Sequence, residues 1–524
     1  MTATATVGWL NGRVYTGHRW VEGILVEGDR VTVAASSAEV RRARPTGATT
    51  VDLAGGWAIP GLIDAHLHLA RSVLAPLGVD LTGVPSVRAL VARVRRRVAG
   101  RSSEPLIGWG WDQERFAERR WPSRDDLDRL PTNRPIVLHR HCLHAAVVNS
   151  AALEMVGLDD GSADPPNGRL GRSRGRLDGL LFEDALARLR PIEARAFEAA
   201  APGVRRFFDR AASFGLTTLA PMNADPRELR TAVGAYEREP LPVRLRWYVR
   251  GDRLTSLPSR PSPRGPEEVR LAGVKIVADG SFGARTAWLE QPYSDAPEES
   301  GLSLGTPEEM TTVVRGATAR RLPVAVHAIG DRALRQVLRV LETERTTGTP
   351  RIEHASLTPP ALIDALAHLG PSIVVQPHFL ASDTWLPERL GEARARWTYA
   401  FRTLRDRGLT VAASSDAPIE PLDPWTGVRS AVAPRPEYAR GEELTPQQAL
   451  EMYTSAAGRA LGEPSLGTLE PGAWADLVVL RGQGWDTLLG LGRDAIHETY
   501  RGGVVTYRAG GSPTSVDAAP TKPI

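Results

Sequence analysis

The sequence AIPGLIDAHLHL, residues 58–69, is the stretch from which the fold can be worked out. It begins as an apolar strand and ends in His66 and His68, two residues apart. Because successive side chains of a strand point to opposite faces, this spacing directs both imidazoles to one side, where they can share a metal ion. Two buried structural histidines would give the same pattern, so the interpretation depends on the rest of the chain.

Four further chemically active residues also stand at or just after the end of an apolar segment. They are Lys275 in LAGVKIVADG, His327 in LPVAVHAIGD, His354 in RIEHASL and Asp416 in LTVAASSDAP. In a parallel α/β barrel the carboxyl ends of all strands surround one active site. The spacings between these four residues, 52, 27 and 62 positions, suit one or two strand–helix units each. We therefore predict that they join His66 and His68 in one site.

The middle of the chain alternates buried strand-like segments with amphipathic helical ones, as in LPVAVHAIG followed by DRALRQVLRVLETER. This alternation predicts an α/β fold with a (β/α)₈ TIM-like barrel over residues 58–465. The gap of 207 positions between His68 and Lys275 is too long for barrel strands alone. The part at about 70–200, rich in Trp, Arg, Pro and Gly, is therefore predicted to be an insertion over the barrel mouth.

Both ends of the chain have a different character. Residues 1–57 and 466–508 contain short strands separated by Gly and Asp turns, and we expect them to pair into one small, discontinuous β-sandwich domain. Residues 509–524 are polar and rich in Pro, Ser and Thr, which predicts a disordered tail.

Composition narrows the class of protein. The 524 residues are 42% hydrophobic and 24% charged with a net charge of +4, as in ordinary globular proteins, and the basic residues are mixed with acidic ones. We therefore expect a small-molecule substrate, no nucleic-acid partner and no membrane partner; a homodimer is compatible with the sequence. Cys142 is the single cysteine, and the first residues do not resemble a secretory signal, so a cytoplasmic location is expected.

The use of lysine is unusual. Of 65 basic residues, only Lys275 and Lys522 are lysines, and Lys522 falls in the polar tail. A single lysine in a folded body that otherwise uses arginine suggests chemistry that a guanidinium cannot perform. An amine can react with CO₂ to form a carbamate, which could bridge two cations; a buried ion pair is the alternative explanation.

Four imidazoles and a carboxylate suit Zn²⁺ or a similar ion. Such an ion lowers the pKa of bound water from about 15.7 towards 7, which makes hydroxide available near neutral pH. A free lysine ammonium would repel the ions, whereas a carbamate would hold them together. The sequence therefore predicts a hydrolytic site with two divalent metal ions, zinc being the expected element.

With these motifs in order, the chain resembles the amidohydrolase superfamily, and within it the family 3, or YtcJ-like, branch. The resemblance runs over nearly the whole chain through IPGLIDAHLHL, GWGWDQERF, NSAAL, GVKIVADGSFGARTAWL, VAVHAIGDRAL, RIEHASL, VVQPHFL, SSDAPIEPLDPWTGVRSAV and LGTLEPGAWADLVVL. It implies the barrel, the split sandwich and the two-metal site, with the lysine carboxylated in many members.

Carried over by position, the resemblance assigns a role to each residue. His66 and His68 with Asp416 would hold the more buried metal ion, His327 and His354 the more exposed one, and N6-carboxylated Lys275 would bridge them. Asp416 would also be the general base. The expected reaction is hydrolysis of a C–N bond in an amide, N-acyl, N-substituted formamide or cyclic amide, by attack of a hydroxide activated by the metal ions.

Substrate contacts are predicted less directly. The segment RHCLHAAVVNSAAL matches the family at His144 and Asn149 but departs from it at 141–143, where relatives carry an Asp-Gly-His or similar triplet, so a relative's substrate cannot simply be transferred. Trp111 in the insertion could line an apolar pocket or pack in a core. The remaining candidates follow strand-like segments and are Arg285, Trp288 and His378.

Two alternatives remain open. One is a mononuclear, deaminase-like hydrolase in which Lys275 is not carboxylated, and metal stoichiometry separates it from the binuclear form. The other is a barrel that has lost catalysis and acts as a binding or scaffold protein. Such a protein should lack one or more ligands, whereas all six are present here.

Overall fold

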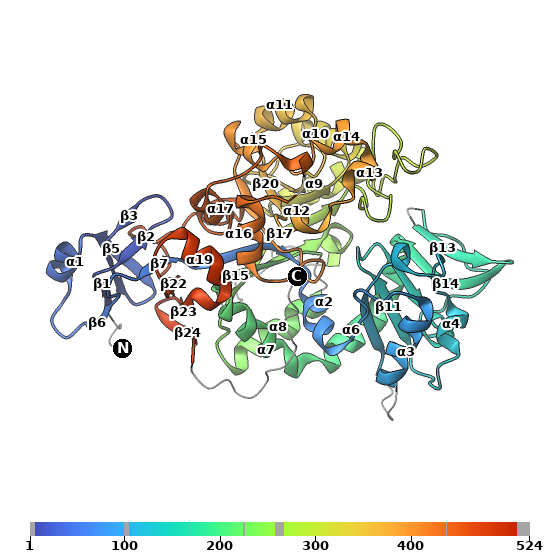
Figure 1. Ribbon diagram of the computed structural model, residues 1–524, viewed down its shortest axis with the longest axis horizontal. Helices are drawn as coiled ribbons and strands as arrows, with labels where there is room; N and C mark the ends of the chain where they lie inside the picture. Colours follow the sequence, from blue (N-terminus) through green and yellow to red (C-terminus); the bar gives the residue numbers. More distant parts are fainter. Residues whose placement is uncertain are drawn as a thin grey trace.

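The computed structural model describes residues 6–98, 104–166, 168–223, 226–256, 267–435 and 437–510. Three bodies lie in a row: a β unit near the N-terminus, a central barrel and a second β unit beyond it (Figure 1). Most of the predicted tail, from residue 511 on, lies outside the described residues. In the described part of the chain, no helix has the length and apolar character needed to cross a membrane.

The central body is the predicted barrel. Its eight parallel strands follow chain order around the ring, and the last lies against the first. Apolar side chains such as Ile63, Tyr248 and Val374 fill its interior. The strands are β8 (Leu62–Leu67), β15 (Leu216–Pro221), β16 (Arg244–Arg250), β17 (Val269–Val277), β18 (Val324–Ala328), β19 (Arg351–His354), β20 (Ser372–Val375) and β21 (Val411–Ala413).

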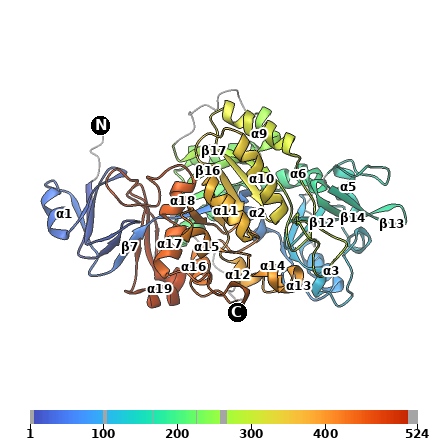
Figure 2. The same cartoon turned by 90° about the horizontal axis from the view of Figure 1, so that it is seen from above.

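Amphipathic helices surround this ring (Figure 2). In α10 (Asp331–Thr343), the buried residues Leu334, Val337, Leu338 and Leu341 recur at helical spacing and face the strands. The other helices around the barrel include α7 (Ala201–Ser213), α8 (Pro226–Arg238), α9 (Pro307–Ala319), α11 (Pro360–Leu369), α15 (Phe401–Asp406), α16 (Pro424–Val432), α17 (Pro446–Met452) and α18 (Ser455–Ala460).

The two chain ends meet in a β-sandwich, as expected. Strand β7 (Trp57–Pro60) pairs antiparallel with β22 (Leu477–Leu480), which joins segments more than 400 residues apart in the sequence. One sheet has the order β24–β23–β22–β7–β2–β3 and the other β5–β4–β1–β6. Side chains of both sheets, Trp9 and Tyr500 among them, share one core. The remaining bounds are β1 (Thr6–Leu10), β2 (Arg13–Tyr15), β3 (Trp20–Val21), β4 (Gly23–Glu27), β5 (Arg30–Ala35), β6 (Thr49–Asp52), β23 (Ile496–Arg501) and β24 (Val504–Arg508).

The insertion between β8 and β15 forms the third body. Its six-stranded sheet has the order β13–β14–β12–β11–β10–β9 and its own apolar core, which includes Trp111. In Figure 1 it lies on the side of the barrel away from the sandwich. Its elements are β9 (Val79–Asp80), α3 (Val87–Val98), β10 (Leu106–Trp111), α4 (Arg124–Asp128), β11 (Ile136–Arg140), β12 (Ala145–Val148), α5 (Ser150–Met155), β13 (Gly168–Ser173) and β14 (Arg176–Glu183), flanked by α2 (Leu69–Leu74) and α6 (Arg190–Ala199).

Candidate metal centre and substrate cavity

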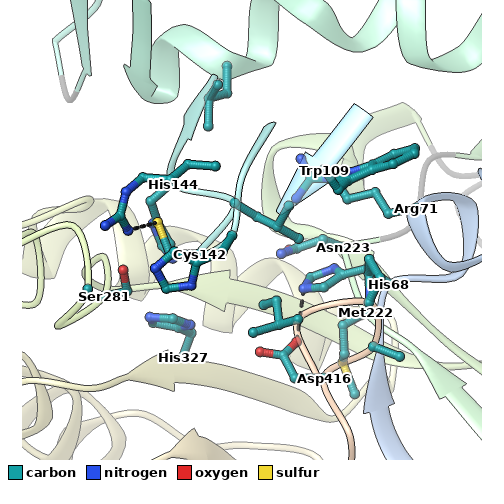
Figure 3. A pocket seen from close by; sticks show the side chains of 18 of the residues that line it. His68, Arg71, Trp109, Cys142, His144, Met222, Asn223, Ser281, His327 and Asp416 are labelled. Atoms are coloured by element: carbon teal, nitrogen blue, oxygen red, sulfur yellow. Dashed lines mark hydrogen bonds and ion pairs between the residues drawn. The ribbon is translucent and has the colours of Figure 1, made fainter. Parts of the chain in front are cut away.

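A cavity of about 1780 Å³ opens where the barrel strands end and the insertion covers them. All six side chains singled out as ligands line it: His66, His68, Lys275, His327, His354 and Asp416. Residues of the insertion, including Trp109 and His144, form another part of the wall (Figure 3). The strand ends and the insertion therefore enclose one space.

The closest group of ligand atoms comes from the two ends of the barrel sheet. His66, His68 and Asp416 each offer an atom within 4.8 Å of the other two. Nε2 of His68 lies 3.1 Å from Oδ1 of Asp416, and Nε2 of His66 lies 3.4 Å from the same oxygen. His66 is on strand β8 and His68 directly follows its last residue, Leu67. Asp416 follows β21 beside it, so closure of the barrel brings the three together.

His66 is fixed by a buried carboxylate behind it. Its Nδ1 donates to Oε2 of Glu353 over 2.7 Å, and Glu353 is fully buried. Arg351 donates to both oxygens of Glu353, over 3.0 and 3.2 Å, and to the carbonyl of Ala65. Since a carboxylate only accepts here, the hydrogen is on Nδ1 and Nε2 keeps a lone pair for a metal ion.

His354 is oriented in a comparable way by an amide. Its Nδ1 lies 2.7 Å from Oε1 of Gln376, and the Gln376 amide nitrogen donates to Ser414 over 3.0 Å. Ser414 in turn donates to the carbonyl of Val375. This chain of donors assigns the hydrogen of His354 to Nδ1 and leaves its Nε2 free to act as a ligand.

His327 has the opposite ring orientation. Its Nε2 donates to the carbonyl of Gly280 over 3.0 Å, so Nδ1 carries the free lone pair. Asp279, fully buried beside it, accepts from the backbone N–H groups of Ile329 and Gly330 and holds the loop after β18 in place. The rings of His327 and His354 are 4.5 Å apart between centroids, close enough to share an ion.

Lys275 lies on β17, and its charge acts on a histidine of each group, His66 and His354. Its side chain is 2% exposed, and its Nζ has no hydrogen-bond partner in the described part of the chain. Burial lowers the pKa of Lys275 to about 8, although Glu353 and Asp416 act in the other direction. A buried amine without a hydrogen-bond partner is energetically unfavourable. This favours a bound group or a covalent modification at the Lys275 amine.

Electrostatics favour neutral imidazoles at this site. Burial lowers the pKa values of His66 and His354 well below the ordinary value, and nearby cationic groups lower them further. Burial alone would raise the pKa of Asp416, but His66, His68 and Lys275 outweigh it and lower the pKa. Neutral nitrogens and an ionised carboxylate are the forms that coordinate metals, so the residues present fit divalent ions.

Two of the ligands are held in a strained backbone. His354 and Asp416 have φ angles of +72° and +55°, in the left-handed region that non-glycine residues avoid. Each such residue costs on the order of 1–3 kcal/mol and persists where the surrounding structure holds it. His354 ends strand β19, Asp416 stands three residues after Ala413, the last residue of β21, and both residues line the cavity.

The predicted substrate contacts divide into two groups. His144 and Arg285 line the cavity. Burial would lower the pKa of His144, but the Glu183 carboxylate, 2.8 Å from Nδ1, raises it to about 9, and the His144 and His327 rings lie 6.3 Å apart. Arg285 pairs with Asp295 at 2.9 Å.

The other four predicted contacts do not line the cavity among the described residues. Asn149 caps α5 and bonds to Ile136 and Arg134, Trp111 donates to the carbonyl of Leu138 in the core of the insertion, and His378 lies 2.9 Å from the carbonyl of Asp423. Trp288 stacks with Arg332, 4.6 Å from its ring centroid. The side chains of these four residues contact other residues of the protein. The order of residues along the chain does not reveal these contacts.

Sequence reasoning missed the residues that orient the ligands. Glu353 precedes His354 directly, and a carboxylate inside an apolar strand was a signal that could have identified it. Gln376 and Asp279 stand in similar positions at strand ends. Arg71, three residues after His68, also lines the cavity and was not predicted.

A parallel barrel with imidazoles, a buried lysine and a carboxylate at its strand ends defines the class of metal-dependent barrel hydrolases. The sequence profile described as the amidohydrolase family matches residues 49–507, and the chain belongs to this family.

Similar proteins agree with this assignment. The chain is similar to the putative amidohydrolase YtcJ of Bacillus subtilis (strain 168), with 33% identity over 90% of this chain and 94% of that protein. It is 26% identical to an N-substituted formamide deformylase of Arthrobacter pascens, over 94% of this chain and 96% of the relative. An uncharacterized metal-dependent hydrolase from Pyrococcus horikoshii OT3 has a similar structure, with a TM-score of 0.80 and 30% identity over 94% of this chain and 100% of that one. These relatives support a hydrolase.

Proposed function

We propose that this protein is a binuclear metal-dependent amidohydrolase that cleaves a C–N bond in an amide, N-acyl, N-substituted formamide or cyclic amide substrate. The observation that carries the proposal is the convergence of six donor side chains on one cavity, with a buried lysine amine among them. The similarity to an N-substituted formamide deformylase supports a formamide or related amide as substrate.

In this proposal His66, His68 and Asp416 would hold one divalent ion, with zinc expected, and His327 and His354 would hold the other. Lys275 reacts as the neutral amine: its nitrogen forms a bond to the carbon of CO₂, releases a proton and becomes an anionic carbamate. Such an anion would offset the repulsion between the two cations that these residues would hold. When bound, the ions supply a hydroxide at neutral pH and polarise a carbonyl oxygen.

The chain's own residues complete the reaction. Asp416 accepts the proton of the attacking water and delivers it to the leaving nitrogen. Glu353 and Gln376 keep the lone pairs of His66 and His354 directed at the site. The insertion covers the strand ends and limits the access of bulk water.

The test is a panel of N-formyl, N-acyl and cyclic amides, assayed with metal analysis of the same purified sample. We expect turnover of at least one amide class and two ions per chain. In Asp416→Asn we expect much of the metal to remain and turnover to fall about 10²-fold or more, because an amide coordinates through oxygen but carries no proton. A single ion with normal turnover would favour the mononuclear form instead.

A further inference from the structure

A second hollow lies on the outer surface of the barrel, between α9 and α10, which pack side by side (Figure 2). This α9–α10 groove has a volume of about 450 Å³, and none of the described residues that line it also lines the cavity with the metal ligands. Gln336 on α10 donates to the carbonyl of Gly305, just before α9, over 2.8 Å and so ties the two walls together. The groove is therefore separate from the candidate metal centre.

Three arginines of α10 line the α9–α10 groove: Arg332, Arg335 and Arg339. They recur at positions i, i+3 and i+7 and therefore share one face of the helix. Glu290 is the one acidic residue among the described lining residues, and its Oε1 pairs with Nε of Arg335 at 2.8 Å. Three arginines and one glutamate leave the groove with an excess of two positive charges.

Arg332 and Arg339 keep their donors available to a ligand. Both side chains are exposed, and neither forms a hydrogen bond or an ion pair with a residue that the structure describes. Arg332 is held by Trp288 instead, with its guanidinium carbon 4.6 Å from the ring centroid. Stacking engages the face of a guanidinium and leaves the N–H groups at its edge free. The two arginines thus present accessible N–H groups on the solvent side of the groove.

The positions of these charges are unfavourable in the absence of an anion. Arg332 is the second residue of α10, at the positive end of the helix dipole, where a cation is disfavoured. Arg335 is three residues from Arg332 and four from Arg339, and like charges at these spacings destabilise a helix. An anion bound in the groove would offset both effects.

The spacing of the two available arginines indicates the shape of the anion. Arg332 and Arg339 are seven residues apart, which corresponds to about two turns and about 10 Å of helix. They therefore lie on the same side of α10, towards its two ends. Each guanidinium can bind one carboxylate through two parallel N–H groups. The wall also contains Pro307 and Val340, against which an alkyl linker can pack.

We propose that the α9–α10 groove binds a dicarboxylate, a small molecule with a carboxylate at each end of an alkyl linker, one end on Arg332 and the other on Arg339. Two single negative charges match the excess of two positive charges. Two phosphate groups would bring about −1.5 to −2 each, which is more than the groove compensates beside Glu290. The inference does not depend on the proposed function.

The test is calorimetric titration of octanedioate into the full-length, metal-loaded protein at low ionic strength. Octanoate, which has the same chain length and one carboxylate, is the matched ligand. We expect one octanedioate per chain and an affinity for octanoate about 10-fold lower, because octanoate can engage one arginine only. Arg332→Gln and Arg339→Gln should each weaken octanedioate binding about 10-fold.

Arg206→Gln is the matched control variant. Arg206 is an exposed arginine on α7 that lines neither the groove nor the cavity, so the substitution removes the same charge elsewhere on the barrel. Its affinity for octanedioate should equal that of the wild type. Without ligand, neither groove variant should have a lower melting temperature than the wild type, because each relieves repulsion between like charges. Loss of binding is thereby distinguished from loss of folding.

Three results would overturn the dicarboxylate site. Unchanged octanedioate affinity in both groove variants would place the ligand elsewhere, as would be the case for a carboxylate bound at the metal centre. Equal affinities of the wild type for octanoate and octanedioate would show that only one carboxylate is recognised. Absence of octanedioate binding to the wild type would remove the site altogether. None of these results depends on turnover of an amide, so the proposed function is tested separately.

Discussion

The Nδ1 atom of His66 lies 2.7 Å from Oε2 of Glu353, in a contact from which solvent is excluded on both sides. The two residues are 287 positions apart and come from strands β8 and β19. Arg351 on β19 binds the other side of the carboxylate. The buried ion pair between Arg351 and Glu353 thus sets the orientation of His66 at the candidate metal site. Because the same pair joins two barrel strands, it couples the geometry of the site to the stability of the barrel.

Glu353→Gln should therefore weaken metal binding and stability together. The amide is a poorer acceptor for His66 and leaves Arg351 buried without its counter-charge. We expect about a 10- to 100-fold loss of metal affinity in a chelator competition, and a loss of about 3–5 kcal/mol in the free energy of unfolding. Glu290→Gln removes an exposed carboxylate paired with Arg335 and should change neither measurement by a comparable amount. Wild-type metal affinity in Glu353→Gln would contradict this role.

Lys275→Ala and Lys275→Arg should each bind one ion fewer and lose nearly all turnover, because neither can form a carbamate. A short carboxylic acid, added with metal free of bicarbonate, should restore part of the activity in the alanine variant by occupying the bridging position. It should not rescue the arginine variant, whose side chain fills the space and stays positive. Metal content per chain and turnover are the measurements.

A control for Lys275 lies on the same strand. Arg270 is 51% exposed at its side chain, and Arg270→Ala should keep both ions. Two ions and normal turnover in Lys275→Arg would rule out the carbamate and favour the mononuclear or ion-pair explanation of this lysine.

Asp383 on the cavity wall should make stability depend on pH in a defined direction. Burial raises the pKa of Asp383 to about 6, above an ordinary value of about 3.9. The folded state then binds more protons than the unfolded state, so this group lowers stability as pH rises from about 4 to about 6, and its penalty is constant above that. Asp383→Asn keeps an acceptor for the Tyr399 hydroxyl and removes the penalty.

We therefore expect Asp383→Asn to gain melting temperature relative to the wild type at pH 7.5, and to gain less at pH 4.5. Thermal unfolding of both proteins at the two pH values measures the difference. An equal difference at both would show that Asp383 does not titrate in this range.

Asn149→Ala should affect stability and leave catalysis intact. The side chain accepts from the backbone N–H groups of Ile136 and Ala152 and donates to the carbonyl of Arg134. Its removal leaves buried backbone groups without partners, at a cost of about 1–3 kcal/mol in the free energy of unfolding. Denaturant unfolding and kcat with an active amide are the measurements. A loss of kcat at unchanged stability would make Asn149 a substrate contact after all.

Much of the fold, and the grouping of the six candidate ligands around one cavity, followed from the sequence. The alternation of strand and helix patterns predicted the barrel, and the two-residue spacing of His66 and His68 predicted a shared direction of their side chains. Lys275 stood out because the chain otherwise uses arginine. These inferences rest on local periodicity and on the rule that parallel strand ends converge, both of which can be applied to a single sequence.

That reasoning did not predict which side chains face the cavity, as four of the predicted substrate contacts show: Trp111, Asn149, Trp288 and His378. Each stands in a motif near the predicted site, yet the tertiary structure engages it elsewhere. Motif order does not show which face of an inserted sheet or loop is turned to the cavity. That depends on how the insertion packs on the barrel.

The sequence by itself determined the barrel, the split sandwich and the residues at the strand ends, because hydrophobic period and strand polarity are local properties. Only the tertiary structure decided that Glu353 holds His66 and that Lys275 is buried with no hydrogen-bond partner among the residues that the structure describes. Hydrogen bonding and burial depend on residues distant in the chain, and the closing of the ring and the docking of the insertion bring those residues together.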